Sequence, residues 1–247
     1  MIADQDRSGW FGASDTAMIM GNWETKTFKK WWMQKLGLDS SHFCSTAMNA
    51  GTYYEHAILE HIGAERMDHQ ILLPEYRLRV NLDGDGPGKI HEVKTYKMAV
   101  VTIPQSAALQ LPEGELPAGQ ERLAWAITQG SLGVKEWKPK KEYIQQVRVQ
   151  MFAKLQEEGS IPAAEIVAYG LGEAEYRNFF LDIDPGRIKR FPVSYDTEFI
   201  NQYLRRLRYL AACLERGVFP ESGKTVCGLP LSHGRAVTAP LTRGAKE

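Results

Sequence analysis

The sequence predicts an α/β (α+β) fold, in which a single domain has a central mixed β-sheet flanked by helices. Helical and strand-like segments follow one another in the order helices, hairpin, helix, strands, helix, which is typical of mixed sheets. Of the 247 residues, 43% are hydrophobic, which is enough to bury one sizeable core. We expect the domain to span residues 1–220, with a long insertion at 98–141, and a flexible tail at 221–247.

Three helices are predicted at the start of the chain. Ser14 or Asp15 can cap the first and Thr25 or Thr27 the second, because these side chains accept a hydrogen bond from a free backbone N–H. The second carries aromatic residues at helical spacing and stops before Gly37, a residue that readily ends a helix. The expected bounds are 15–20, 25 or 27 to 36, and 46–62.

A β-hairpin is predicted next, because a dense turn signal at residues 83–88 (DGDGPG) separates two strand-like runs. An irregular segment rich in Pro and Gly follows, with a short helix expected inside it at 120–129. The remaining elements alternate between helical and strand-like patterns. The expected strands are 76–82, 89–96, 164–169 and 176–183, and the expected helices are 141–157 and 196 or 197 to 216.

Composition excludes several classes of protein. The 30 basic and 30 acidic residues cancel, which argues against a protein that coats nucleic acid by bulk charge, although local basic patches are compatible with this total. No run of 18 apolar residues is present, so we expect no membrane span, and the polar start MIADQDRSGW does not suit a signal peptide. Three scattered cysteines without CxxC spacing indicate a reducing compartment, so we expect a cytoplasmic protein without a cysteine-bound metal.

The hairpin carries the residues with the clearest chemistry. Asp83 closes its first strand, and Glu92 and Lys94 share one face of its second strand, because side chains alternate along a strand. Two carboxylates and one ammonium group on one patch can hold Mg²⁺ and orient or deprotonate its bound water. The competing interpretation is a surface strand with an Asp-Gly turn and a Glu/Lys pair, and it is the more frequent one for such a pattern.

A third carboxylate points towards the same chemistry. On the helix at 46–62, Glu55 lies in a stripe with Met48, Gly51, Ile58 and Ile62 at spacings of three and four. A carboxylate in a core-facing stripe costs free energy unless a cation or a hydrogen-bond donor meets it. A Glu at the edge of the stripe that reaches water or pairs with an Arg is the alternative.

Five sequence blocks in a fixed order resemble the phage lambda-type exonucleases, which are the YqaJ-like viral recombinase family of the PD-(D/E)xK nuclease superfamily. The resemblance spans roughly residues 7–220, and each block is weak alone, whereas their order is fairly specific. The blocks are Gly12-Ala13-Ser14-Asp15, Ala47-Met48-x-x-Gly51-x-x-x-Glu55, Asn81-Leu82-Asp83-Gly84, Glu92-Val93-Lys94-Thr95 and Gln146-Val147-x-Val149-Gln150-Met151.

The resemblance implies a role for each matching residue. Asp83, Glu92 and the carbonyl of Val93 would bind Mg²⁺, Glu55 would hold a second ion or its water, and Lys94 would position the attacking water. Two ions are implied, with Mn²⁺ as a substitute. Gln146 matches the glutamine that lines this site. A further pair, Arg7 and Ser14, would bind the 5′ phosphate of the DNA end. The alternatives are a surface charge for Arg7 and a helix cap for Ser14.

The implied activity is digestion of linear double-stranded DNA from the 5′ end to give 3′ single strands for phage-type recombination. It implies a trimer, a single-strand annealing protein as partner and, for a phage protein, the bacterial host cytoplasm. A restriction or defence endonuclease and a non-catalytic DNA-binding protein of the same fold are the alternatives. The sequence departs from the family at its long insertion and at Arg148, where a second Gln is common.

Local basic runs indicate a path for DNA despite the zero total. We expect DNA contacts from Arg148, from Trp137 by base stacking, and from Lys138 beside it. Solvated surface charge is the alternative for such runs. The lysines concerned are Lys26, Lys29, Lys30 and Lys35 on the second helix and Lys135, Lys138, Lys140 and Lys141 before the helix that carries Gln146.

Overall fold

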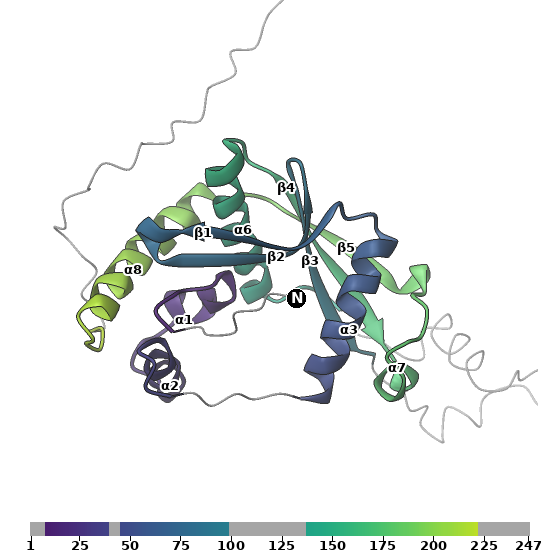
Figure 1. The fold of residues 1–247 in the computed structure, drawn as a ribbon, viewed down its shortest axis with the longest axis horizontal. Coiled ribbons are helices and arrows are strands. Elements are labelled where there is room, and N and C mark those ends of the chain that lie inside the picture. Colours follow the sequence, from purple (N-terminus) through teal and green to yellow (C-terminus); the bar gives the residue numbers. More distant parts are fainter. Residues whose placement is uncertain (1–7, 40–44, 99–136, 222–247) are drawn as a thin grey trace, which may run out of the picture.

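Five β-strands form one sheet in the order β1-β2-β3-β4-β5 (Figure 1). Neighbouring strands are antiparallel except for β3 and β4, which are parallel, so the predicted mixed sheet is confirmed. The computed structural model describes residues 8–39, 45–98 and 137–221. The strands are β1 (Arg66–Leu73), β2 (Leu78–Gly86), β3 (Lys89–Lys97), β4 (Ala163–Leu171) and β5 (Ile188–Val193).

The helices form where capping residues and apolar spacing predict them. Thr25 Oγ1 accepts a hydrogen bond from Phe28 N, and Asp196 Oδ1 accepts one from Phe199 N, so both predicted caps are present. None of the described helices combines the length and apolar character that a bilayer span requires. The helices are α1 (Thr16–Met20), α2 (Lys26–Lys35), α3 (Thr46–His61), α6 (Lys141–Glu158), α7 (Glu173–Arg177) and α8 (Thr197–Glu215), with 3-10 turns η1 (Ala13–Asp15), η2 (Pro74–Tyr76) and η3 (Pro185–Arg187).

Two expectations about the strands and their turn are wrong, and one strand was not predicted. The sequence pattern missed β1, whose charged first half shows no regular alternation. The strand expected at residues 176–183 is absent, because this segment holds the end of α7 and irregular chain, and the fifth strand is Ile188–Val193 instead. Pro192 lies within β5, which is an edge strand and therefore tolerates a missing N–H. The turn expected at 83–88 is only two residues long, because β2 continues to Gly86.

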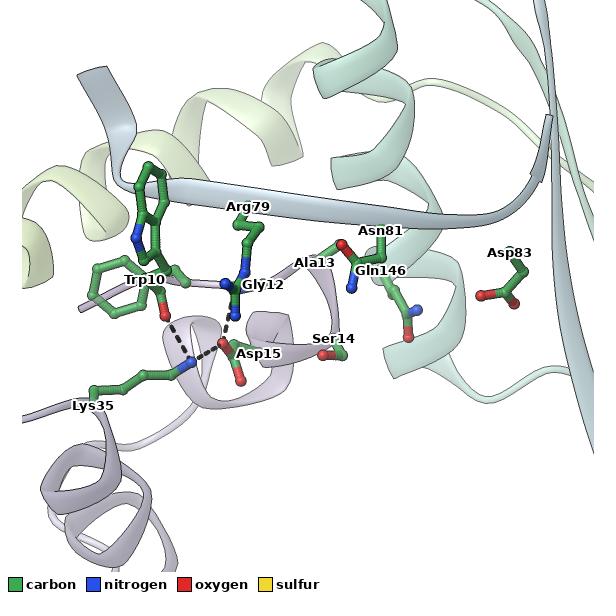
Figure 2. Close-up of a pocket in the computed structure, with 11 residues that line it drawn as sticks. Trp10, Gly12, Ala13, Ser14, Asp15, Lys35, Arg79, Asn81, Asp83 and Gln146 are labelled. Carbon is green, nitrogen blue, oxygen red and sulfur yellow. Dashed lines mark hydrogen bonds and ion pairs between the residues drawn. The ribbon is translucent and has the colours of Figure 1, made fainter. Parts of the chain in front are cut away.

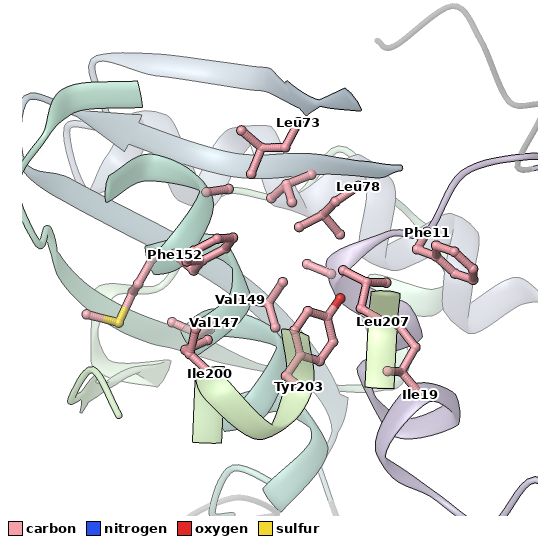
Figure 3. Close-up of a cluster of buried hydrophobic side chains, with 14 of the residues drawn as sticks. Phe11, Ile19, Leu73, Leu78, Val147, Val149, Phe152, Ile200, Tyr203 and Leu207 are labelled. Carbon is pink, nitrogen blue, oxygen red and sulfur yellow. The ribbon is translucent and has the colours of Figure 1, made fainter. Parts of the chain in front are cut away.

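Two apolar clusters cover opposite faces of the sheet. On one face α6 packs against the strands, with α1, α2 and α8 around it, and this cluster contains Val147, Phe152, Tyr203 and Leu207 (Figure 3). On the other face α3 packs against β3 and β4 through Tyr54 and neighbouring apolar residues. Side chains of β3 therefore alternate between α6 and α3.

The ladder between β2 and β3 is short, and this opens the sheet. These strands pair only from Gly84 opposite His91 to Gly86 opposite Lys89, whereas β1 follows β2 along its length and β4 follows β3. In Figure 1 the β1–β2 ribbon accordingly swings away from the other three strands. Beyond Gly84 and His91, the facing edges of β2 and β3 are free to carry side-chain chemistry.

Candidate active site

Asp83 and Glu92 lie where the β2–β3 ladder ends. Asp83 Oδ2 accepts a hydrogen bond from the backbone N–H of Val93 at 2.8 Å, so this carboxylate takes the place of a ladder acceptor. Glu92 lies opposite and is fully buried. The hairpin thus brings Asp83 beside the part of β3 that carries Glu92.

The carboxylate of Glu92 is surrounded by donors. The ammonium group of Lys94 and the side-chain amide of Gln146 both contact Glu92 Oε1, and the amide of Gln150 contacts Glu92 Oε2. Lys94 Nζ also donates to the carbonyl of Val93 at 3.1 Å and lies 5.6 Å from the ring centre of Tyr143. Glu92 and Lys94 thus face α6, on one face of β3 as their spacing predicts.

Glu55 reaches the same place from α3, although the stripe predicted for this helix is partly wrong. Met48 is 53% exposed, and the buried stripe is instead formed by Ala50, Tyr54 and Ile58. Glu55 lies at the edge of that stripe and is half-buried. Its carboxylate lies within 4.8 Å of ligand atoms of His56 and Asp68, and it is close enough to Glu92 and Lys94 for their charges, after burial, to act on its pKa.

Two glycines let α3 approach the strands. A Cβ added to Gly51 would lie 3.1 Å from Thr95 Oγ1 on β3, and one added to Gly84 would lie 3.2 Å from the Cβ of Ala64 and collide with Leu59. Larger residues at these positions would push α3 outward. Both glycines belong to the sequence blocks that suggested a nuclease.

Burial and mutual repulsion shift the titration of this cluster. Burial raises the pKa of Asp83 well above its usual range, and the charge of Glu92 raises it further. Burial and the charge of Glu92 also raise the pKa of Glu55. Burial opposes the charge of Lys94, but Glu92 and Asp83 outweigh it and raise the pKa of its ammonium group. Asp83 and Glu92 are held close together, and their negative charges repel each other. A divalent cation between them would relieve this repulsion, so the group of carboxylates fits a metal.

We expect Ca²⁺ to stabilise the protein more as the pH rises. The pKa values of Asp83 and Glu55 in the folded protein lie above their ordinary values of 3.8 and 4.5. The protonated carboxyls therefore stabilise the metal-free fold at low pH, and this stabilisation is lost as the pH rises through the raised pKa values. A cation binds the charged forms. The increase in melting temperature caused by Ca²⁺, measured by calorimetry, should be several degrees larger near pH 8 than near pH 5. Asp83→Asn should remove most of this difference, and a Ca²⁺ effect independent of pH would contradict the prediction.

A cavity of about 210 Å³ adjoins Asp83 and extends towards η1 (Figure 2). It is lined by Ser14, Asn81, Asp83 and Gln146 at one end, and by Lys35 and Arg79 among others towards the opposite end. The exposed side chain of Ser14 therefore opens onto the same space as Asp83 and Gln146, as a phosphate-binding role would require.

The η1 turn that carries Ser14 rests on a buried ion pair. Lys35 Nζ lies 2.6 Å from Asp15 Oδ2 and donates to the carbonyl of Trp10 at 2.8 Å. Asp15 also accepts hydrogen bonds from Gly12 N and from the indole of Trp31. The expectation that Lys35 lies on a DNA-facing surface is wrong, because its side chain is 3% exposed and neutralises Asp15.

The other predicted contact residues lie apart from the carboxylates. Arg148 projects towards β5 and α8, where it pairs with Asp196 at 2.9 Å. Trp137 stacks on Tyr96 at 5.2 Å between ring centres, while Lys138 is exposed. Arg7 lies outside the described residues.

No role for Gln150 followed from the sequence, although this residue lies in the fifth sequence block, and the sequence did not indicate the buried pair of Lys154 and Asp85. Gln146, Gln150 and Lys154 are four residues apart on α6, so they form one polar stripe that faces the sheet. Lys154 pairs with Asp85, and both side chains are fully buried. Polar residues at helical spacing in an otherwise apolar helix were the available signal.

Solved structures share this fold. The alkaline exonuclease LHK-Exo from Laribacter hongkongensis is 19% identical, with a TM-score of 0.52 over 85% of this chain and 90% of that chain, and its complex with dAMP gives a TM-score of 0.53 at the same coverage and identity. A phage related exonuclease from Haemophilus somnus 129PT is 12% identical, with a TM-score of 0.52 over 84% of this chain and 94% of that chain. The fold expected from the sequence resemblance is therefore confirmed. No protein-family model and no curated protein matches the sequence.

Proposed function

We propose that this protein is a magnesium-dependent DNA exonuclease. The observation that carries the proposal is the convergence of Asp83, Glu92, Glu55 and Lys94 at the open end of the β2–β3 ladder. The similarity of the fold to that of two exonucleases supports it. The structure of one of them with dAMP further supports a DNA substrate.

The three carboxylates and the carbonyl of Val93 would hold Mg²⁺, with Mn²⁺ as a substitute, and two ions suit a site with this many acidic groups. When bound, the metal neutralises charge on the scissile phosphate and makes a bound water more acidic. A carboxylate offers about four lone-pair sites, so the contacts of Glu92 with Lys94, Gln146 and Gln150 leave one site, on Oε2, for a ligand role.

Lys94 is best suited to orient the attacking water or the phosphate. In the metal-free protein, Glu92 and Asp83 outweigh burial and raise the pKa of this ammonium group, so we assign it the role of a hydrogen-bond donor and not that of a base. Its contacts with Glu92 and the Val93 carbonyl hold it beside the proposed metal ligands. Of the two roles that the sequence allows, orientation is therefore the one that the charge state favours.

The substrate proposed for this site is the end of linear double-stranded DNA, degraded from 5′ to 3′. Arg7 and Ser14 would bind the terminal 5′ phosphate in the cavity beside Asp83 and Gln146, and Arg148, Trp137 and Lys138 would contact DNA farther away. The product would be 3′ single strands for phage-type recombination. A trimer around DNA and a single-strand annealing protein as partner complete the proposal.

Digestion of end-labelled linear duplex in Mg²⁺ tests this function directly. We expect release of nucleotides from the 5′ end, no cleavage of covalently closed circles, and no activity with EDTA. Cleavage of closed circles would instead identify an endonuclease. Absence of metal-dependent cleavage on every form of DNA would favour a non-catalytic binding protein.

Arg7→Ala is expected to slow digestion of 5′-phosphorylated ends about tenfold or more, because an arginine that binds a phosphate forms charge-assisted hydrogen bonds. Digestion of 5′-hydroxyl ends should change much less. Initial rates on the two substrates measure the ratio, and Arg177→Ala, at an exposed position of α7, serves as a control for loss of surface charge. Equal slowing of both substrates would remove the proposed role of Arg7.

A further inference from the structure

The buried amide of Gln150 bridges the two strands that carry the proposed metal ligands. Its Nε2 contacts Glu92 Oε2 on β3 and donates to the backbone carbonyl of Asn81 on β2 at 3.2 Å. Asn81 lies two residues before Asp83 on the same strand. The bridge therefore crosses the sheet where backbone pairing between β2 and β3 has already ended.

Gln150 and Gln146 occupy different positions relative to the cavity. Gln146 is half-buried and lines the cavity with Asp83 and Ser14, so it can meet a substrate. Gln150 is fully buried one turn further along α6 and is not among the residues that line the cavity. Any influence of Gln150 on the reaction therefore passes through Glu92 or through the position of β2.

Packing alone does not account for an amide at this position. Gln150 Nε2 lies against two acceptors, which settles the orientation of the amide, and its Oε1 has no hydrogen-bond partner among the described residues. A buried acceptor without a partner lowers stability. The adjacent residues Val149 and Met151 are apolar and buried, so an apolar side chain would suit this part of the core.

We propose that Gln150 is a positioning residue for metal binding. It holds the Glu92 carboxylate and fixes the separation of β2 and β3, so that Asp83 and Glu92 are arranged for a cation before the cation arrives. This inference rests on the proposed function, because it assumes that these two carboxylates bind the metal. Groups that orient a metal ligand commonly change affinity by about 10- to 100-fold when they are removed.

Calcium titration calorimetry of the full-length protein without DNA tests the proposal. Gln150→Met, which removes the bridge at similar volume, should weaken Ca²⁺ binding about 10- to 100-fold. Gln150→Asn keeps an amide that is too short to reach both partners, and it should give a smaller loss. Gln156→Met, at an exposed position of the same helix, should bind Ca²⁺ as the unaltered protein does.

The outcomes separate this inference from the proposed function. If Gln150→Met folds, as judged by thermal unfolding, and binds Ca²⁺ with unchanged affinity, Gln150 has only a structural role and the inference is wrong. Should Gln150→Met fail to fold, unchanged affinity in Gln150→Asn would overturn it equally. If the unaltered protein binds no Ca²⁺, or if Asp83→Asn binds as tightly as the unaltered protein, the metal site itself is wrong and both proposals fall.

Discussion

Asp83→Asn is expected to lower the rate of DNA cleavage by about a thousandfold or more while the fold remains intact. The reason for the loss is that a metal ligand contributes several kcal/mol to stabilising charge in the transition state, and about 4 kcal/mol corresponds to a thousandfold. The reason for the intact fold is that burial and Glu92 raise the pKa of Asp83, so its charge is unfavourable in the metal-free protein. A neutral isostere removes that cost, and the metal-free variant should melt at the same temperature as the unaltered protein or above it.

Initial rates on end-labelled linear duplex and thermal unfolding without metal measure the two effects together. Glu92→Gln should lose cleavage to a similar extent, because it removes the other β-strand carboxylate of the site. Glu198→Gln, at an exposed position on α8, makes the same chemical change away from the site and should keep full activity. Cleavage by Asp83→Asn within tenfold of the unaltered rate would place the metal site elsewhere.

Lys154→Ala is expected to give the largest loss of stability, about 3 kcal/mol in the free energy of unfolding. Lys154 and Asp85 pair with no exposed side-chain surface, and removal of one partner from a buried pair typically costs about 3–5 kcal/mol. We expect the lower end of that range because Arg66 and His69 also contact Asp85 Oδ2 and remain in place. The buried carboxylate of Asp85, which lies next to the turn of the β2–β3 hairpin, would keep only these two partly exposed partners.

Urea unfolding followed by circular dichroism measures this free energy. Lys30→Ala, at an exposed position of α2, should change it by less than about 0.5 kcal/mol. A double change, Lys154→Met with Asp85→Asn, removes both charges and should recover a large part of the loss. A Lys154→Ala variant as stable as the unaltered protein would show that Asp85 is not held as a charged group in the core.

The sequence was sufficient to predict on which face of its own element a candidate residue lies. Strand alternation places Glu92 and Lys94 on one face, and the structure confirms that both face α6. Helical spacing and caps located α2, α3, α6 and α8 closely. These signals are local, since alternation and capping depend on residues within one or two turns of each other.

The sequence failed where long-range pairing overrides local pattern. Lys35 looks like a solvent-facing lysine on a basic helix, yet it is buried against the carboxylate of Asp15, which lies 20 positions earlier in η1. Asp85 looked like a turn residue, yet β2 continues past it and Lys154 of α6 neutralises it. In both cases a distant partner of opposite charge offsets the cost of burial, and no local pattern reports that partner.

The sequence alone predicts that Glu92 and Lys94 share one face of a strand and nominates Asp83 and Glu55 as further candidates, because alternation and helical spacing are properties of single elements. Only the tertiary structure decided that β2 and β3 separate after Gly84, that α3 brings Glu55 to the opening, and that Gln150 bridges the gap. The physical reason is that strand register, helix approach and buried polar contacts are set by packing between elements remote in sequence. The 30 acidic and 30 basic residues therefore cancel only in total. Several carboxylates gather at the proposed metal site, and other charges form buried ion pairs away from it.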